Sequence, residues 1–251
     1  MSWSSFNCTN PDFSVRSIPD DVKFDVSKNS LINGSEVFRN MFSICDVSRT
    51  ETTETNVLDL DEAAGILTVL LRLIHEPPEE YDPVDFVPLD KFETQIPVIT
   101  PTAAIPLPLL PKLFQLADKY ELSQPIVRTL QTHLVAHKST SPLRVYGIAT
   151  QLSLDTIAAE ASYYLLLPPL RTYSLADIRS IPTAEAYHKL VLLHSYRISK
   201  LREIVLGEEI FPHGYGECPA HKLVIEHAWD ERRKEVAIRI ESGGHLSQAV
   251  L

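Results

Sequence analysis

The chain has 251 residues, of which 44% are hydrophobic and 22% charged, a composition typical of a globular protein and not of a disordered or fibrous one. The net charge is −10, and the acidity lies in residues 1–106, which carry 18 acidic against 7 basic side chains. The only dense basic run, residues 232–234, is flanked by acids, so the sequence lacks the basic face of a nucleic-acid-binding protein and we expect no such partner.

The first predicted elements are a β-hairpin and a helix. Apolar and polar residues alternate along residues 13–18 and 22–26, on either side of the turn residues 19–21, which predicts a hairpin with one buried face. The apolar residues of 37–42 then follow helical spacing. The period of the pattern has changed from two to about 3.6 residues.

A short strand at 56–60 and a helix that ends by Pro77 are predicted next, with Asp61 as the helix cap. Residues 77–111 hold 9 of the 18 prolines, each of which removes a backbone donor. We therefore interpret about 77–106 as an inserted acidic loop, and we expect limited proteolysis to cut there first.

Helical spacing dominates the rest of the chain. It predicts a helix over 109–120 and another after Pro125. Further helices are expected at 142–152, 154–167, 174–181 behind a Ser174-x-x-Asp177 capping box, 183–206 and about 219–241. The predicted fold class is thus α+β: a small sheet with helices, followed by an all-helical region.

The residues in these elements resemble the BTB/POZ family, especially divergent fungal members that carry a helical tail. The matching segments are Asp12-Phe13, Val22–Lys28, Ser35–Phe42, Val57–Leu60, Leu70–Ile74 and Leu109–Tyr120. The resemblance covers residues 11–138, which would form a BTB/POZ-like domain with the insert at about 77–106. Residues 139–251 would form a helical C-terminal region that supports this domain or recognises a second protein.

The resemblance implies a non-enzymatic adaptor that docks proteins or forms a homodimer. The hairpin and first helix commonly line the family's dimer face, which places Asp12, Phe13, Phe38 and Met41 in or beneath it. Core packing is the alternative for Phe38 and Met41, since large apolar residues at helical spacing are mostly buried. An apolar patch related to itself by a two-fold axis would give a closed dimer.

Two departures from the family pattern bear on its partners. Ser27 stands where many members have a histidine. The insert of about 30 residues falls where the family has a short connection and a strand, in the neighbourhood that helps BTB adaptors contact a cullin scaffold. The family also implies a substrate adaptor of a cullin-type ubiquitin ligase, with the cullin as a possible partner; because the insert alters that neighbourhood, this is the alternative function.

One cluster has the residue types of a metal site: His213, Cys218, His221 and His227. Cys218 and His221 have the two-residue spacing of zinc ligands, but a structural zinc needs a second such pair. We therefore expect no metal, no cofactor and no catalytic residue, and purified protein without stoichiometric zinc. A hydrolase or metal-binding protein that uses this region is the alternative of another class.

The cysteines and the apolar stretches indicate the compartment. Three scattered cysteines, Cys8, Cys45 and Cys218, do not make a disulfide framework and fit a reducing environment. The first residues lack the basic flank and apolar core of a signal peptide, and no apolar stretch approaches the roughly 20 residues that span a bilayer. We expect an intracellular protein, cytoplasmic or nuclear, without a membrane partner.

Overall fold

The computed structural model describes residues 3–47, 57–76, 104–165, 169–207 and 221–242. The chain divides into two compact units, Met1–Thr140 and Ser141–Leu251, and each is described by itself. The fold is α+β, as predicted: a three-stranded sheet and helices in the first unit, and helices in the described part of the second. Among the described helices, none combines the length and the hydropathy needed to cross a membrane.

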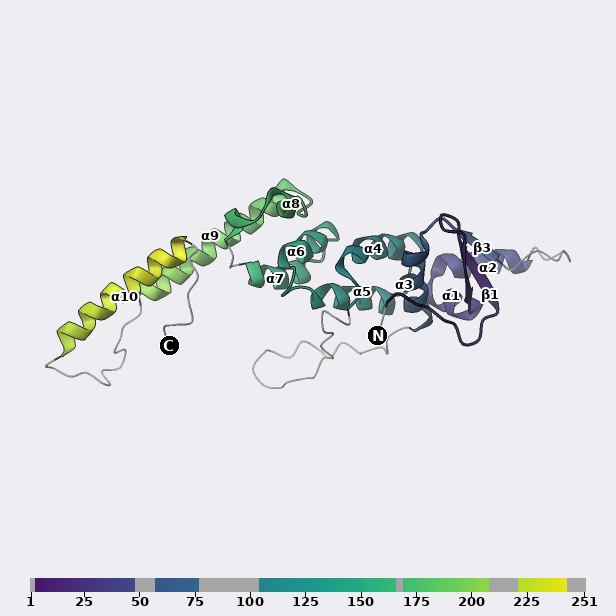
Figure 1. The fold of residues 1–251 in the computed structure, drawn as a ribbon, viewed down its shortest axis with the longest axis horizontal. Helices are drawn as coiled ribbons and strands as arrows, with labels where there is room; N and C mark the ends of the chain where they lie inside the picture. Colours follow the sequence, from purple (N-terminus) through teal and green to yellow (C-terminus); the bar gives the residue numbers. More distant parts are fainter. Residues whose placement is uncertain (1–2, 48–56, 77–103, 166–168, 208–220, 243–251) are drawn as a thin grey trace. The chain divides into compact units, whose positions relative to one another are not determined.

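The sheet has the strand order β2-β1-β3. The predicted hairpin is confirmed, with β1 (Phe13–Ser17) antiparallel to β2 (Val22–Val26). The predicted strand near residue 58 is β3 (Val57–Leu60), which pairs parallel with the other side of β1. Parallel pairing requires a long crossover, and the two helices between β2 and β3 supply it. Figure 1 shows this sheet at one end of the first unit, beside α1 and α2.

Two helices, not one, follow the hairpin: α1 (Lys28–Gly34) and α2 (Glu36–Val47). Ser27 caps α1, since its side chain accepts a hydrogen bond from the Ser30 N–H. The Ser35 hydroxyl accepts from the Phe38 N–H at 3.2 Å and donates to the Tyr120 carbonyl at 2.5 Å. The helix is therefore interrupted at Ser35, because the Ser35 side chain caps α2 and also bonds to a distant segment.

The predicted cap of α3 (Ala64–His75) is wrong. The N-cap is Ala63, which makes no side-chain cap bond, and Asp61 does not serve. The Ala64 N–H instead donates to Asp20 Oδ2 at 2.5 Å. Asp20 lies in the hairpin turn, so the cap comes from another element that the fold brings to the start of the helix.

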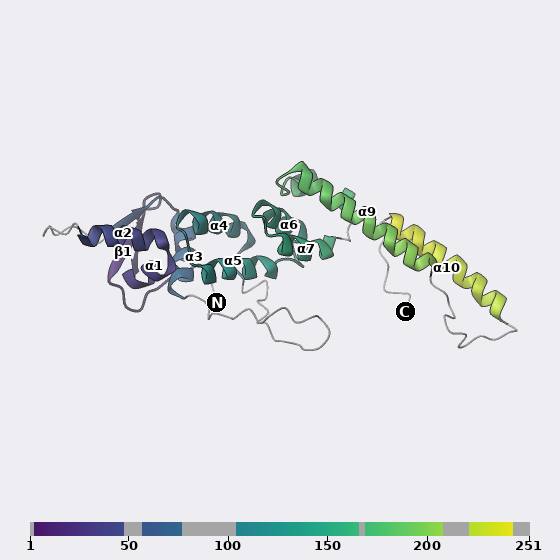
Figure 2. The same cartoon turned by 180° about the vertical axis from the view of Figure 1, so that it is seen from behind.

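The remaining helices of the first unit are α4 (Leu110–Lys119), preceded by the short η1 (Leu107–Leu109), and α5 (Gln124–Ala136). The junction between α4 and α5 is bonded to the junction between α1 and α2: the Glu36 N–H donates to the Glu121 carbonyl, and the Ser123 N–H to the Gly34 carbonyl. Figure 2 shows α4 and α5 running side by side. The core between these helices contains the fully buried side chains Leu31, Phe38, Leu67, Leu70, Leu110, Leu113, Leu116, Ile126 and Leu130.

The end of the predicted insert belongs to this core. Ala104 and Ile105 are buried, and Ile105 is fully so, contrary to an exposed loop that reaches residue 106. The Ile105 N–H donates to His133 Nδ1, and its carbonyl lies 2.8 Å from His137 Nε2. Two histidines of α5 thus hold this segment. The rest of the insert, 77–103, lies outside the described residues.

All the regular elements in the described part of the second unit are helices. They are α6 (Pro142–Gln151), α7 (Asp155–Ser162), η2 (Tyr163–Leu165), η3 (Leu170–Thr172), α8 (Leu175–Ile178), α9 (Ala184–Gly207) and α10 (Lys222–Ser242). The predicted N-cap at Ser174 is confirmed, since its hydroxyl accepts from the Asp177 N–H, and the same hydroxyl donates to the Asp177 carboxylate. α9 and α10 lie side by side as a helical hairpin (Figure 1).

Candidate functional site

The structure places the four predicted dimer-face residues in different environments. Phe38 is 2% exposed and stacks on the Tyr120 ring at 5.1 Å, so it belongs to the core and not to a surface. Phe13 is half-buried with its ring edge-on to Phe42, and Met41 is half-buried as well. Asp12 is exposed, and its carboxylate accepts a hydrogen bond from the Lys28 N–H at 2.6 Å. Phe13 and Met41 therefore remain as apolar surface candidates.

An apolar stripe on α2 extends this pair. Val37, Met41 and Ile44 are spaced at i, i+4 and i+7, and the Ile44 side chain is 67% exposed. The helical spacing of residues 37–42 predicted the helix without Ile44, and it could not show which of the two apolar rows is buried. Val37, Met41 and Ile44, here called the α2 stripe, are less buried than the neighbouring row of Phe38 and Phe42.

An N-terminal arm, residues 3–10, lies against α3 and α5, and the sequence patterns assigned it no role. The Trp3 ring meets His133 edge-on, with centroids 5.0 Å apart, and the Arg72 guanidinium lies 4.8 Å from its centre. The Phe6 ring meets His75 at 4.9 Å. The arm is thus anchored by two aromatic side chains three positions apart.

Burial is the main cause that favours the neutral form of the two histidines that contact the arm. His75 Nε2 accepts from the Ser27 N–H at 2.9 Å, so Nδ1 must carry the proton that it donates to the Leu71 carbonyl. Desolvation by burial lowers the pKa of His75. It also lowers the pKa of His133 to about 4, helped by the neighbouring His137. With both ring nitrogens occupied, His75 is not placed to act as a general base.

The buried His133 predicts a loss of stability in acid. Its folded pKa of about 4 lies below the unfolded value of 6.5, so its contribution to stability is complete above pH 6.5 and is lost as the pH falls toward 4. We expect the free energy of unfolding to fall by about 2 kcal/mol more between pH 6.5 and 4.5 in the wild type than in His133→Asn. The asparagine oxygen can accept the same bond from Ile105 without titrating.

Urea unfolding at a series of pH values, followed by far-ultraviolet circular dichroism, measures this difference. His188→Asn is the matched control, because His188 is exposed on α9. It should keep the wild-type pH dependence. An unchanged pH dependence in His133→Asn would show that this histidine is not held neutral in the folded chain.

A polar pocket of about 350 Å³ lies beside the arm. It is lined by Asn7, Cys8, Thr9 and Asn10 of the arm and by Ser27, Ser30, His75 and Glu76. Cys8 is a half-buried free thiol. Among the residues that the structure describes, no three His, Cys, Asp or Glu side chains are grouped to hold a metal ion.

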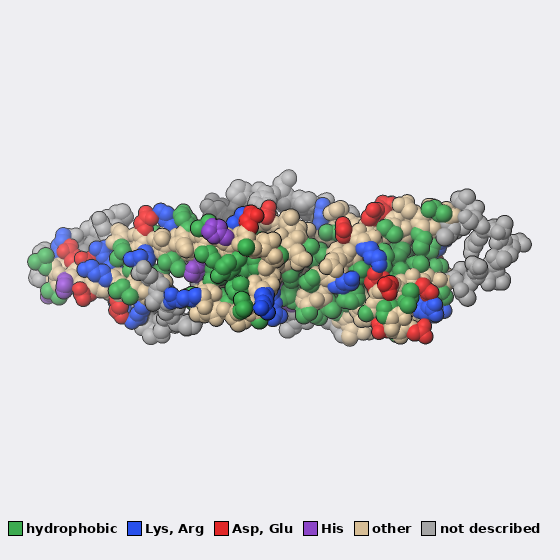
Figure 3. All heavy atoms as spheres, turned by 90° about the horizontal axis from the view of Figure 1, so that it is seen from above, with side chains coloured by type: hydrophobic (Ala, Val, Ile, Leu, Met, Phe, Trp, Pro, Cys, Tyr) green, Lys and Arg blue, Asp and Glu red, His purple; other side chains and the backbone are tan. Residues whose placement is uncertain are grey.

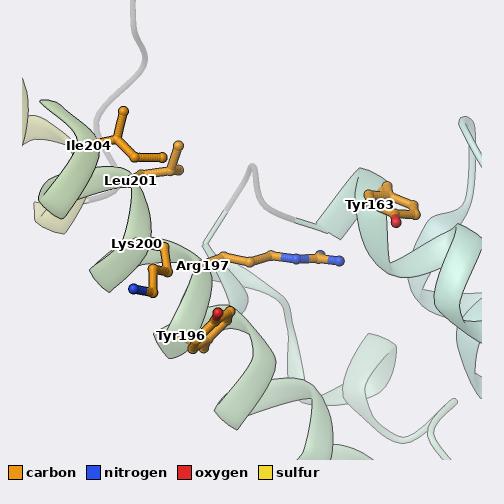
Figure 4. A pocket seen from close by; sticks show the side chains of 6 residues that line it. All are labelled: Tyr163, Tyr196, Arg197, Lys200, Leu201 and Ile204. Carbon is orange, nitrogen blue, oxygen red and sulfur yellow. The ribbon is translucent and has the colours of Figure 1, made fainter. Parts of the chain in front are cut away.

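A second pocket, of about 290 Å³, lies in the helical unit and is more apolar. Its lining residues are Tyr163, Tyr196, Arg197, Lys200, Leu201 and Ile204. Figure 4 shows five of them along α9, with Arg197 extended toward Tyr163. Arg197 donates to the Ser162 carbonyl at 2.5 Å and lies over the Tyr163 ring. The arginine therefore joins α9 to the end of α7.

The α9–α10 hairpin exposes more apolar side chains than it buries. Along these two helices, the described residues that are buried are Ala186, Leu190 and Ala237. The exposed large apolar residues are Leu192, Tyr196, Ile204, Leu206, Leu223, Val224 and Ile238. Figure 3 shows hydrophobic side chains among lysines and arginines over this part of the chain.

The predicted metal-type cluster is not brought together in the described part of the chain. His213 and Cys218 lie outside the described residues. His221 directly precedes α10, and His227 is exposed on it. The described residues therefore provide no arrangement of side chains that supports the alternative function at Cys218 and His221.

Comparison with known proteins gives no family for the chain. No family model matches its sequence, and no curated protein matches it with significant similarity. The class that the fold itself defines is an α+β protein: a first unit with a small mixed sheet and helices, and a second unit whose described elements are helices.

Proposed function

We propose that the chain is a protein-interaction adaptor whose residues 11–138 form a BTB/POZ-like domain. One observation supports this most directly. The segments that resemble the family fall, in order, on the β1–β2 hairpin, α2, β3, α3 and α4, all within one compact unit. Unrelated leucine stripes would not be expected to follow that order and also pack around one core.

The proposed dimer contact is the α2 stripe together with Phe13. These side chains are apolar and accessible, and a two-fold axis would bring the stripe onto its own copy. Phe38 supports the contact from beneath by packing on Tyr120. Charge opposes it, since residues 1–106 carry a net charge of −11, from 18 acidic and 7 basic side chains.

Sedimentation across a salt series tests this proposal. We expect a dimer at micromolar concentration whose affinity rises with ionic strength, because salt screens the like charges. Ile44→Asp should make the chain monomeric by placing a carboxylate in the apolar contact. Ile238→Asp is the control, since Ile238 is a similarly exposed isoleucine on α10, outside the proposed contact. A wild type that is monomeric at every salt concentration would contradict the dimer, and identical behaviour of the two variants would contradict the α2 stripe.

A further inference from the structure

We propose that the surface of α3 and α5 that holds the N-terminal arm is a peptide-recognition site, which a partner segment with two aromatic residues three positions apart enters by displacing the arm. The site consists of Arg72, His75 and His133, here called the arm site. This inference builds on the proposed adaptor function and adds a partner chemistry to it.

The first step is the match between the two aromatic anchors of the arm, Trp3 and Phe6, and the side chains of the arm site that contact them, here called the receivers. The Arg72 guanidinium lies 4.8 Å from the Trp3 ring centre, and the Trp3 and His133 rings meet edge-to-face at 5.0 Å. Phe6 meets the His75 ring at 4.9 Å. A cation near an aromatic face and edge-to-face ring pairs are both favourable, so each anchor has a specific receiver. The spacing of the two receivers selects aromatic residues at positions i and i+3.

The second step is that the body of the domain positions the receivers. His75 bonds to the backbone at both ring nitrogens, and His133 accepts from the Ile105 N–H. Arg72 Nε lies 3.1 Å from a Glu76 carboxylate oxygen, and its side chain is mostly buried. These bonds join the receiving side chains to the body of the domain, which therefore helps to position them independently of the arm. A preformed site avoids the cost of ordering side chains on binding.

The third step is that the arm is a replaceable occupant. Trp3 and Phe6 are only half-buried where they lie. The polar pocket of about 350 Å³ remains between residues 7–10 of the arm and the body. A partner peptide that fills this pocket would bury more surface than the arm does. The exposed Glu76 carboxylate at the pocket disfavours acidic residues after the second aromatic, so the partner there is uncharged and polar.

Fluorescence anisotropy with a labelled peptide tests competition by the arm. The probe is Trp-Ser-Ser-Phe-Asn-Ser-Thr-Asn, which is residues 3–10 with serine in place of Cys8. It should bind the full-length Trp3→Ala/Phe6→Ala variant at least about tenfold more tightly than the wild type, where the tethered arm lowers the fraction of free sites. A probe with one spacer residue removed should bind the variant at least about tenfold more weakly, because the two receivers are fixed.

A second measurement keeps the native arm and so does not depend on the variant's folding. In full-length Trp229→Phe, Trp3 is the remaining tryptophan, and a competitor peptide with phenylalanine for tryptophan should shift its emission to the red on displacement. No binding to the arm variant up to millimolar peptide, equal affinity for both spacings, or an unmoved Trp3 emission would each overturn the proposal. Sedimentation of the arm variant separates the two hypotheses, since the proposed dimer contact on α2 does not use the arm site.

Discussion

The Glu62→Ala variant is expected to lose about 3 kcal/mol of unfolding free energy, because it leaves a buried tyrosine hydroxyl without its acceptor. The Glu62 side chain is 4% exposed. Its carboxylate accepts from the Tyr120 hydroxyl at 2.6 Å and lies 2.5 Å from the Lys119 ammonium. Burial and the Glu62 carboxylate raise the pKa of Tyr120 far above its usual range, so the hydroxyl remains a donor. Lys119 is half-exposed and can return to water, which limits the loss.

Glu36→Ala is the matched control for this substitution. Glu36 also pairs with a cation, Arg39, but both side chains are about half exposed. Its removal should cost no more than about 0.5 kcal/mol, as for other surface ion pairs. Urea unfolding followed by far-ultraviolet circular dichroism measures both variants. Equal losses for Glu36→Ala and Glu62→Ala would show that the buried cluster gives no special stability.

The sequence predicted the elements whose pattern is local. The hairpin, β3 and the helices from α2 to α10 follow from alternation, helical spacing and capping residues within a few positions of one another. It could not predict the bonds that join distant segments. The Asp20 cap of α3 spans 44 positions, and the Ser35 bond to Tyr120, which separates α1 from α2, spans 85. Such bonds form only once the fold has brought the segments together.

The surfaces were harder to predict than the elements, for a related reason. Helical spacing puts two apolar rows on α2. Packing against distant residues, Tyr120 on Phe38 and Phe13 on Phe42, shows which row is buried. The arm shows no hydrophobic periodicity that would predict a helix or a strand. Trp3 and Phe6 anchor the arm by contacting Arg72, His75 and His133, which lie on two helices far along the chain. The pair of aromatics in a polar N-terminal stretch was the one signal that could have drawn attention to it.

Gly147→Ala is the second substitution expected to have a large effect. Gly147 is buried in α6, where an added Cβ would lie 2.2 Å from the Ser180 carbonyl oxygen. That carbonyl cannot move easily, because the Ser180 N–H and hydroxyl both donate to the Asp177 carbonyl. The clash is therefore with fixed backbone. Although alanine is a better helix former, we expect the variant to lose roughly 2–3 kcal/mol of unfolding free energy.

Gly207→Ala separates this clash from the intrinsic effect of removing a glycine. Gly207 is the last residue of α9, in the same unit, and an added Cβ would meet nothing within 4 Å. Alanine there should be neutral or should stabilise by up to about 1 kcal/mol, because glycine is the more flexible residue in the unfolded chain. Urea unfolding followed by Trp229 fluorescence in a Trp3→Phe background reports on this unit. If Gly147→Ala were as stable as Gly207→Ala, α6 could not lie directly against the turn at Ser180, and the packing of the helical unit would have to differ from the one described.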